Sequence, residues 1–403
     1  MNTKVLFGLG VGALVLSACA AALADDGAAV TDAGTDGPAI VSPIEGVAGD
    51  SDDPFAGVNL KFNPSFWPET DFTQHTIDYN EVQGLLRADQ IRPIDNPQFE
   101  PVSAADGRIA DQEPVIALEI DGDARAYQLS ILTWTEIAND TVGGRPVAVT
   151  FCPLCNAAIV FDRTVDGQEL TFGTTGNLRN SDLVMWDRQT SSWWQQFTGE
   201  AIVGEFAGTQ LEFLPSQVVS WAEFKEAFPD GQALVSPGTG QPGRNPYAGY
   251  DTNGSPFAFG GDIDERLFPV ERVLGLIQGG EIVAYPFEAL SEVGVVNDTL
   301  GDKDVVIFFQ PGQVSALDQS SIVDSREVGS AAAFSAVLDG ETLTFSSDDD
   351  VISDDQTGSR WNVFGQAVEG PLAGSELDPL LAFPHFWFAW AAFQPETDIW
   401  SLS

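Results

Sequence analysis

The sequence predicts a mainly β fold of the α+β type, in which two homologous β-rich domains with minor helices follow one another in tandem. Three observations predict it. Short runs of β-branched and aromatic residues alternate with turn signals, helical patterns are few and short, and motifs of the first half recur in the second. The 403-residue chain is long enough for two domains of ordinary size.

The first 18 residues have the pattern of a signal peptide. Lys4 precedes an apolar run over residues 5–16, which is too short to span a bilayer. The run ends at Leu16-Ser17-Ala18-Cys19, which resembles the lipobox of bacterial lipoproteins, and this resemblance implies cleavage before Cys19 and a lipid on its thiol. The alternative is cleavage after Ala24, which discards Cys19. Either pathway predicts an exported protein of the cell envelope, and the first adds a membrane anchor.

Residues 19–54 follow as a flexible acidic tether of Asp, Gly, Ala, Thr and Pro. We expect residues 55–110 to form an extended arm that packs on the first domain. Over the whole chain 60 acidic residues oppose 17 Lys and Arg, giving a net charge of -43. This charge excludes nucleic acid as an expected partner, because a phosphate backbone would be repelled.

The two β-rich repeats span residues 111–236 and 269–398, with a linker at 237–268. Helices are expected at 130–138 and 221–228, and strands at 147–151, 158–161 and 170–172. Asp-Gly pairs at 166–167 and 339–340 predict hairpin turns with positive φ. The recurring motifs are AYQL at 126–129 with AYPF at 284–287, NDTVG at 139–143 with NDTLG at 297–301, and VDGQELTF at 165–172 with LDGETLTF at 338–345.

Four segments carry a family resemblance: IDNP at 94–97, ARAY at 124–127, NDTVGGRPVAVTFCPLCNAAIVFDR at 139–163 and GRNPYAGYD at 243–251. Together they resemble a bacterial and archaeal family known as domain-of-unknown-function family number 3179. The resemblance implies a grouping and no chemistry. Similar sequences usually read Trp-His-Glu where this chain has Trp134-Thr135-Glu136, so no role of that histidine transfers to this chain.

Cys152 and Cys155 stand out because the second repeat has Gln310 and Gln313 in their place. Residues kept in both repeats are best explained by a shared scaffold, whereas a pair confined to one repeat points to a special site. Three interpretations stay open. The pair forms a structural disulfide, binds a metal as thiolates, or acts as a redox-active dithiol. A strand is expected after the motif, which argues against a thioredoxin fold.

Met185 and His385 are the candidate additional metal ligands, because the mature chain has few other soft or nitrogen ligands. Two thiolates joined by a Met or a His suit copper in its Cu(I) state, which makes copper the expected metal. The alternatives are ordinary strand packing for Met185 and a buried or interface position for His385.

Arg244 and Tyr247 lie between the repeats, where they are expected to line a cleft or simply to belong to an ordered linker. The sequence has no serine-hydrolase, zinc-protease or phosphate-loop motif. We therefore expect an extracytoplasmic lipoprotein whose Cys152/Cys155 pair binds copper or cycles as a redox dithiol. The alternative is a non-enzymatic surface module, with a structural disulfide, that binds a protein or a glycan.

Overall fold

The alternating apolar runs form strands, and helices are short and few, as expected. The computed structural model describes residues 53–238 and 245–402, of which strands make up 42% and helices 13%. The prediction of a mainly β protein is therefore confirmed. The expected signal peptide, Cys19, almost all of the tether and Arg244 lie outside the described residues. None of the helices in the described part is long and apolar enough to cross a membrane.

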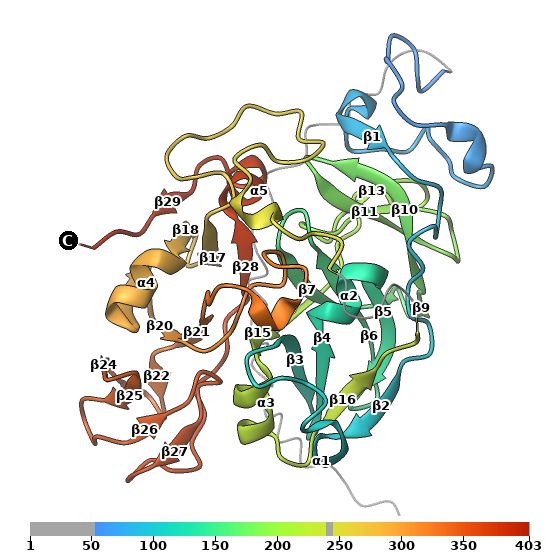
Figure 1. Ribbon diagram of the computed structural model, residues 1–403. Helices are drawn as coiled ribbons and strands as arrows, with labels where there is room; N and C mark the ends of the chain where they lie inside the picture. Colours follow the sequence, from blue (N-terminus) through green and yellow to red (C-terminus); the bar gives the residue numbers. More distant parts are fainter. Residues whose placement is uncertain (1–52, 239–244, 403) are drawn as a thin grey trace, which may run out of the picture. The chain divides into compact units, whose positions relative to one another are not determined.

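Two antiparallel hairpins follow the N-terminal arm in the first half of the chain. The β3–β4 hairpin belongs to a five-stranded sheet of order β15-β3-β4-β16-β2, and β5, β6 and β7 form a four-stranded sheet with β14. Figure 1 labels these strands except β14. The bounds are β2 Gln98–Pro101, α1 Val102–Ala105, β3 Pro114–Ile120, β4 Asp123–Gln128, α2 Leu129–Thr135, β5 Ile137–Val142, β6 Arg145–Cys152, β7 Ala157–Asp162, β14 Phe213–Leu214, β15 Gln217–Ser220, α3 Trp221–Ala227 and β16 Gln232–Val235.

A third sheet carries the N-terminal arm. Its order is β1-β10-β11-β12-β13, and aromatic residues of the arm pack against Trp193 and Val203 of this sheet. In Figure 1 the blue arm accordingly lies beside the green strands β10, β11 and β13. The bounds are η1 Pro64–Phe66, η2 Tyr79–Glu81, β1 Val82–Gly84, β10 Phe172–Arg179, β11 Asp182–Asp187, β12 Trp193–Gln195 and β13 Ala201–Val203.

Most elements of the second half follow the order of the first. A hairpin, a short helix and three antiparallel strands are followed by a small hairpin and a four-stranded sheet. The bounds are η3 Tyr250–Thr252, β17 Arg272–Gln278, β18 Glu281–Pro286, α4 Phe287–Val293, β19 Val295–Leu300, β20 Lys303–Gln310, η4 Ile322–Asp324, β21 Ser330–Ser335, β22 Val337–Leu338, β23 Glu341–Thr342, β24 Phe345–Asp348, β25 Val351–Asp354, β26 Arg360–Trp361, β27 Ala367–Glu369, β28 Ala382–Phe386, α5 Trp387–Phe393 and β29 Asp398–Ile399.

Several buried polar contacts occur in both halves. Tyr127 donates to Asp140 over 2.6 Å, and Tyr285 donates to Asp298 over 2.8 Å. The indole of Trp194 donates to Asp187 over 2.9 Å. Likewise, the Trp361 indole donates to Asp354 over 3.1 Å. Recurring motifs of the sequence thus make matching hydrogen bonds.

Some predictions of single turns and helices are confirmed, and others are wrong at the boundaries of the element. Both Asp-Gly pairs form hairpin turns with positive φ, between β8 (Thr164–Val165) and β9 (Gln168–Glu169) and between β22 and β23. Ser220 caps α3 with a full capping box. The prediction of a strand over 170–172 was wrong at its start, because β10 begins at Phe172. The first helix ends before residue 138, because Glu136 leaves the helical conformation and β5 begins at Ile137.

The segment after residue 244 packs closely against both halves. Ser181 donates to the carbonyl of Phe257, and Asn245 donates to backbone oxygens of the loop between β20 and β21. Asp251 is buried in an ion pair with Arg272, at 3.0 Å. This part of the expected linker, residues 245–268, is therefore ordered and contacts both halves, and we refer to it as the covering segment.

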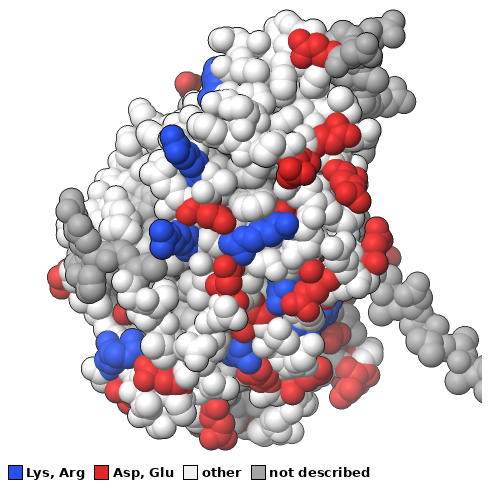
Figure 2. Space-filling model, turned by 90° about the vertical axis from the view of Figure 1, so that its right-hand side faces the viewer, with Lys and Arg blue, Asp and Glu red and all other residues white. Residues whose placement is uncertain are grey.

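Basic side chains lie among acidic ones. Figure 2 shows them scattered over the displayed face rather than gathered into a basic patch. Ion pairs account for this placement, for example Arg125 between Asp123 and Asp140, and Lys225 between Asp106 and Asp111. The Arg125 pair with Asp140 is largely shielded from solvent, whereas the Arg360 pair with Glu369 is exposed on both sides and stabilises the fold little.

Candidate metal and thiol site

The two cysteines flank a tight turn between β6 and β7. Cys152 ends β6, and the N–H of Cys155 donates to the Cys152 carbonyl over 3.3 Å, which closes a β-turn. Pro153 stands at the second turn position, where its fixed φ is favourable. Asn156 takes a left-handed φ of 51° and returns the chain to β7. Both sulfurs therefore lie on the same side of the turn, as the Cys-x-x-Cys spacing predicts.

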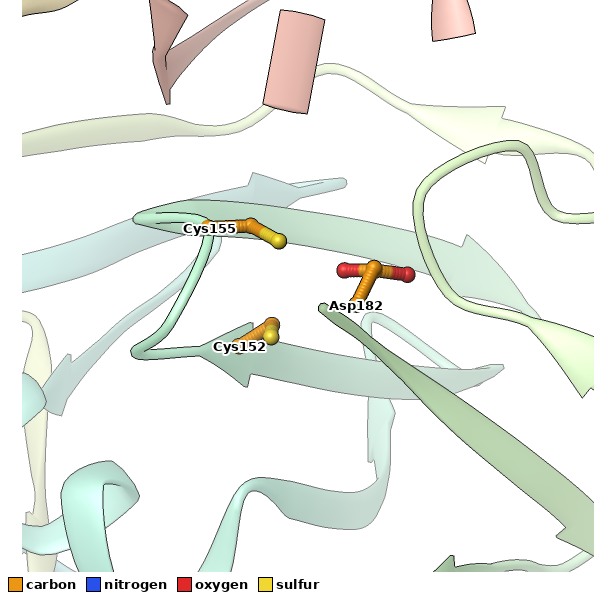
Figure 3. A group of neighbouring side chains, drawn as sticks. All are labelled: Cys152, Cys155 and Asp182. Atoms are coloured by element: carbon orange, nitrogen blue, oxygen red, sulfur yellow. The ribbon is translucent and has the colours of Figure 1, made fainter. Parts of the chain in front are cut away.

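Asp182 joins the cysteines from a different sheet. It begins β11 directly after the Asn180-Ser181 turn, whose residues have φ of 52° and 67°. The two sulfurs lie 4.0 Å apart, and one carboxylate oxygen of Asp182 lies within 4.8 Å of both. Figure 3 shows the three side chains converging. Both cysteines are free thiols, so the disulfide kept as an alternative is not present between them.

The Asp182 carboxylate is buried and only partly paired. Its Oδ2 accepts hydrogen bonds from Gln195 Nε2 at 2.6 Å and from the Phe197 N–H at 2.9 Å. Its Oδ1 is buried, and in the described part of the chain it has no hydrogen-bond partner at ordinary distance; weak interactions with the two thiols lower the pKa of the carboxyl group slightly. Burial raises the pKa of Asp182 to about 7 despite these bonds. A buried acceptor of this kind is a ready ligand for a cation.

Burial also raises the pKa of both thiols. The neighbouring carboxyl groups of Asp182 and Glu136 add to the increase in the pKa of Cys152. For Cys155, whose pKa lies well above its usual value, the contributions after burial come from Cys152 and Asp182. Redox-active and nucleophilic cysteines have a lowered pKa, which a nearby cation or helix N-terminus produces. Here a strand follows the motif and the charged neighbours are acids.

Glu136 is a second buried acid that the sequence analysis did not single out. It follows α2 with a φ of 57°, where the end of α4 has Gly294 with a φ of 70°. The N–H of Phe151 donates to its carbonyl just as Phe309 donates to that of Gly294. Burial raises the pKa of Glu136 to about 8, and the charge of Asp182 contributes. The signal was present in the sequence, because the corresponding position of the second half has Gly294.

Asp182 was also missed. Its hairpin, β10–β11, is longer than the corresponding β24–β25 hairpin, which turns at Asp349 and Asp350. The extra length carries Asp182 toward the cysteine turn. A comparison of hairpin lengths between the two halves could have found it, but the sequence alone does not say where the longer hairpin points.

Met185 belongs to the same hydrophobic core cluster as Cys152 and Cys155. It lies three residues after Asp182 on β11, so alternation directs the two side chains to opposite faces, and Met185 is fully buried in the hydrophobic core. It pairs across the sheet with Thr174 and Trp194.

His385 is buried on β28, between the rings of Phe197 and Trp390 at centroid distances of 4.3 and 5.4 Å. It is not part of the Cys152, Cys155 and Asp182 group. Burial lowers the pKa of His385 to about 3, so the imidazole is neutral. Its backbone neighbour Phe386 donates to the Cys155 carbonyl over 2.8 Å, which ties β28 to the turn.

A pocket of about 710 Å³ opens beside the cysteine turn. Leu154 lines it from the turn and Tyr247 from the covering segment, while Glu136 also lines it. Tyr247 is thus a pocket-lining residue. Its predicted companion Arg244 lies outside the described residues.

A family model described as "Protein of unknown function (DUF3179)" matches residues 88–397. The chain belongs to this family. The DUF3179 region contains the cysteine turn, Glu136, Asp182 and the pocket-lining Tyr247, so the whole candidate site lies within it. Neither the curated proteins nor the solved structures include a match to this chain.

Proposed function

We propose that the chain is an extracytoplasmic lipoprotein that binds a thiophilic metal ion through Cys152, Cys155 and Asp182. The observation that carries this proposal is the buried, unpaired carboxylate oxygen beside two buried free thiols. The lipid on Cys19 anchors the protein to a membrane, and its strong negative charge excludes nucleic acid as a partner.

The charge of the cluster favours a cation as its ligand. Two thiols and a carboxyl group lie together away from solvent. Burial raises the pKa of all three groups, so both thiols are protonated near neutral pH, whereas Asp182, with a pKa of about 7, is partly ionised. A metal ion replaces these protons and compensates the charges that remain. The apparent affinity for the metal is therefore expected to rise with pH.

Copper is the metal we propose first, because two thiolates suit Cu(I) by ligand softness. The carboxylate oxygen favours Zn²⁺ as a second candidate, since Zn²⁺ accepts sulfur and oxygen ligands together. Two Zn–S bonds of about 2.3 Å at the tetrahedral angle would hold the sulfurs about 3.8 Å apart. The observed 4.0 Å is close to that value.

A redox dithiol is the second candidate function. The β-turn that brings the sulfurs together favours it, because a modest approach would allow a disulfide of about 2.05 Å. The raised thiol pKa values argue against it, because the thiolate is the reactive form. A surface module that binds a protein or a glycan would leave the unpaired Asp182 oxygen unexplained.

We further propose that the two halves arose by internal duplication and that the metal site is a specialisation of the first. The recurring motifs, the shared order of elements and the matching Tyr-Asp and Trp-Asp hydrogen bonds support this proposal. The cysteines, Glu136 and the extended hairpin that carries Asp182 all belong to the first half.

Metal titration of the purified mature protein tests the site. We expect one tightly bound Cu(I) or Zn²⁺ per chain, measured under anaerobic conditions against a chromogenic chelator. Cys152→Ser/Cys155→Ser should abolish this binding, and Asp182→Asn should weaken it at least tenfold. Asp349→Asn, at the exposed turn of the second-half hairpin, is the matched control and should bind as the wild type does.

Two results would decide against metal binding. Unchanged metal affinity in Cys152→Ser/Cys155→Ser would show that the two cysteines do not form a metal site. If the wild type instead retains no metal but consumes one equivalent of oxidant as its two thiols disappear, the redox function would take precedence.

A further inference from the structure

The pocket beside the cysteine turn has the size of a small-molecule site. Its volume of about 710 Å³ lies within the range of pockets that enclose drug-sized ligands. Its walls come from the arm, the irregular part of β10, the cysteine turn and the covering segment. Most of the lining is apolar: Leu85, Leu86, Ile91, Leu154, Leu178, Leu183, Pro246, Tyr247, Ala248, Tyr250 and Phe257.

Large apolar side chains are exposed at this pocket. Leu85, Leu86 and Phe257 are 47%, 38% and 52% exposed, and all three contribute to its lining. They come from segments far apart in the sequence. Apolar surface gathered around a concavity marks a binding site more strongly than the same residues scattered singly.

A buried polar group lies in the pocket wall without a partner. Asn177 is 3% exposed, lines the pocket, and its Nδ2 has no hydrogen-bond partner among the described residues. Leaving a buried amide unpaired costs about 1–3 kcal/mol. The buried Glu136 carboxyl lines the same pocket. A rotation of the Asn177 side chain that brings Nδ2 to the pocket surface would let a ligand with a hydrogen-bonding group satisfy the amide and recover that cost.

The charges of the lining side chains disfavour an anionic ligand. The described lining residues include no Lys, Arg or His, so no lining side chain would compensate an anionic ligand. The corresponding pocket of the second half has a different lining. There Gly294 and Ser347, at the positions of Glu136 and Thr174, line a pocket of about 940 Å³ together with charged residues of both signs, such as Glu288 and Arg326. The apolar pocket thus belongs to the half that has the cysteines.

We infer that this pocket binds an uncharged, largely apolar small molecule whose carbonyl or similar group bonds the Asn177 amide. Leu154 lies between the two cysteines in the sequence and lines the pocket, so the bound molecule lies next to the cysteine turn. The inference rests on the pocket itself and does not require that the proposed metal be bound.

Binding of the uncharged naphthyl ketone prodan tests the inference, because its emission shifts to the blue in an apolar site. The experiment uses the full mature chain with Cys19→Ala, so that no detergent competes for the dye. We expect saturable binding of one prodan per chain. A sulfonated naphthalene dye of similar size should bind at least tenfold more weakly.

Three variants locate the dye. Ala248 is exposed and lines the pocket, so Ala248→Trp should fill the space and weaken prodan binding at least tenfold. Ala373→Trp, at an exposed position in the second half, should bind as the wild type does. Asn177→Leu should weaken binding about fivefold and remove the hydrogen-bonded component of the emission.

The pocket and the Asn177 amide are tested by different results. Absence of saturable binding, or wild-type affinity in Ala248→Trp, would overturn the pocket as a ligand site. Wild-type affinity in Asn177→Leu, with its fold checked by circular dichroism, would overturn the role of the amide. Cys152→Ser/Cys155→Ser should keep prodan binding, so a failed metal titration and a failed ligand titration are independent results.

Discussion

Glu136 is an acidic residue in a backbone conformation that favours glycine. Left-handed φ values cost a residue with a Cβ about 1 kcal/mol relative to glycine, and burying the carboxyl group adds to that cost. The second half avoids both costs with Gly294. Glu136 faces the apolar pocket and Asp182. These neighbours best explain why an acidic residue stands here despite both costs.

The raised pKa of Glu136 predicts a pH-dependent stability. The folded state holds its proton up to a pKa of about 8, whereas the unfolded carboxyl group loses it near 4.5. The stabilisation is therefore complete below about pH 4.5 and is lost as the pH rises through 8. Glu136→Gln should reduce the fall in unfolding free energy between pH 5 and pH 8.5 by roughly 3 kcal/mol.

Urea unfolding at the two pH values measures this effect. Asp182 titrates in an overlapping range, so the pH dependence should shrink and not vanish. Glu281→Gln, at an exposed site on β18, serves as the control and should leave the slope unchanged. A Glu136→Gln protein with the wild-type slope would contradict the assigned burial of the carboxyl group.

The hairpins show how far local sequence determines an element. The turn between β5 and β6 consists of Gly143 and Gly144, with φ of 55° and 84°, and its register aligns Val142 with Arg145. Two-residue turns of this kind demand positive φ at both positions, which the sequence pattern predicts. What the pattern does not reveal is that one of the two glycines also touches the neighbouring β3–β4 hairpin.

Two alanine substitutions in this turn separate local from tertiary effects. A Cβ on Gly144 would meet no atom within 4 Å, so Gly144→Ala should cost about 1 kcal/mol from its φ alone. A Cβ on Gly143 would lie 2.3 Å from the Ile120 carbonyl oxygen. Gly143→Ala should therefore destabilise the protein by at least about 2 kcal/mol more. Equal losses in urea unfolding would contradict the close approach of the two hairpins.

At the scale of the whole molecule, the N-terminal processing decides where in the cell envelope the metal site and the pocket lie. An anchored protein would hold the metal site and the pocket close to a membrane, where apolar small molecules concentrate. The lipid is expected on Cys19, which lies outside the described residues, so the test must be made in cells.

Cys19→Ala is expected to release the protein from the membrane. In a bacterium that processes lipoproteins, the wild type should fractionate with membranes and require detergent for extraction. The variant should appear in the soluble extracytoplasmic fraction, with an unchanged melting temperature after purification. Wild-type protein that is fully soluble without detergent would instead support cleavage after Ala24.

The sequence by itself determined the β-rich class, the Asp-Gly hairpins and the family, and it singled out Cys152 and Cys155. These features depend on local backbone preferences, on shared motifs or on direct comparison of the two halves of the chain. Only the tertiary structure brought Asp182 to the sulfurs and put His385 outside that group, between two aromatic rings. Those placements depend on how a hairpin of one sheet reaches the turn of another, which is decided by long-range packing and not by neighbours in the chain.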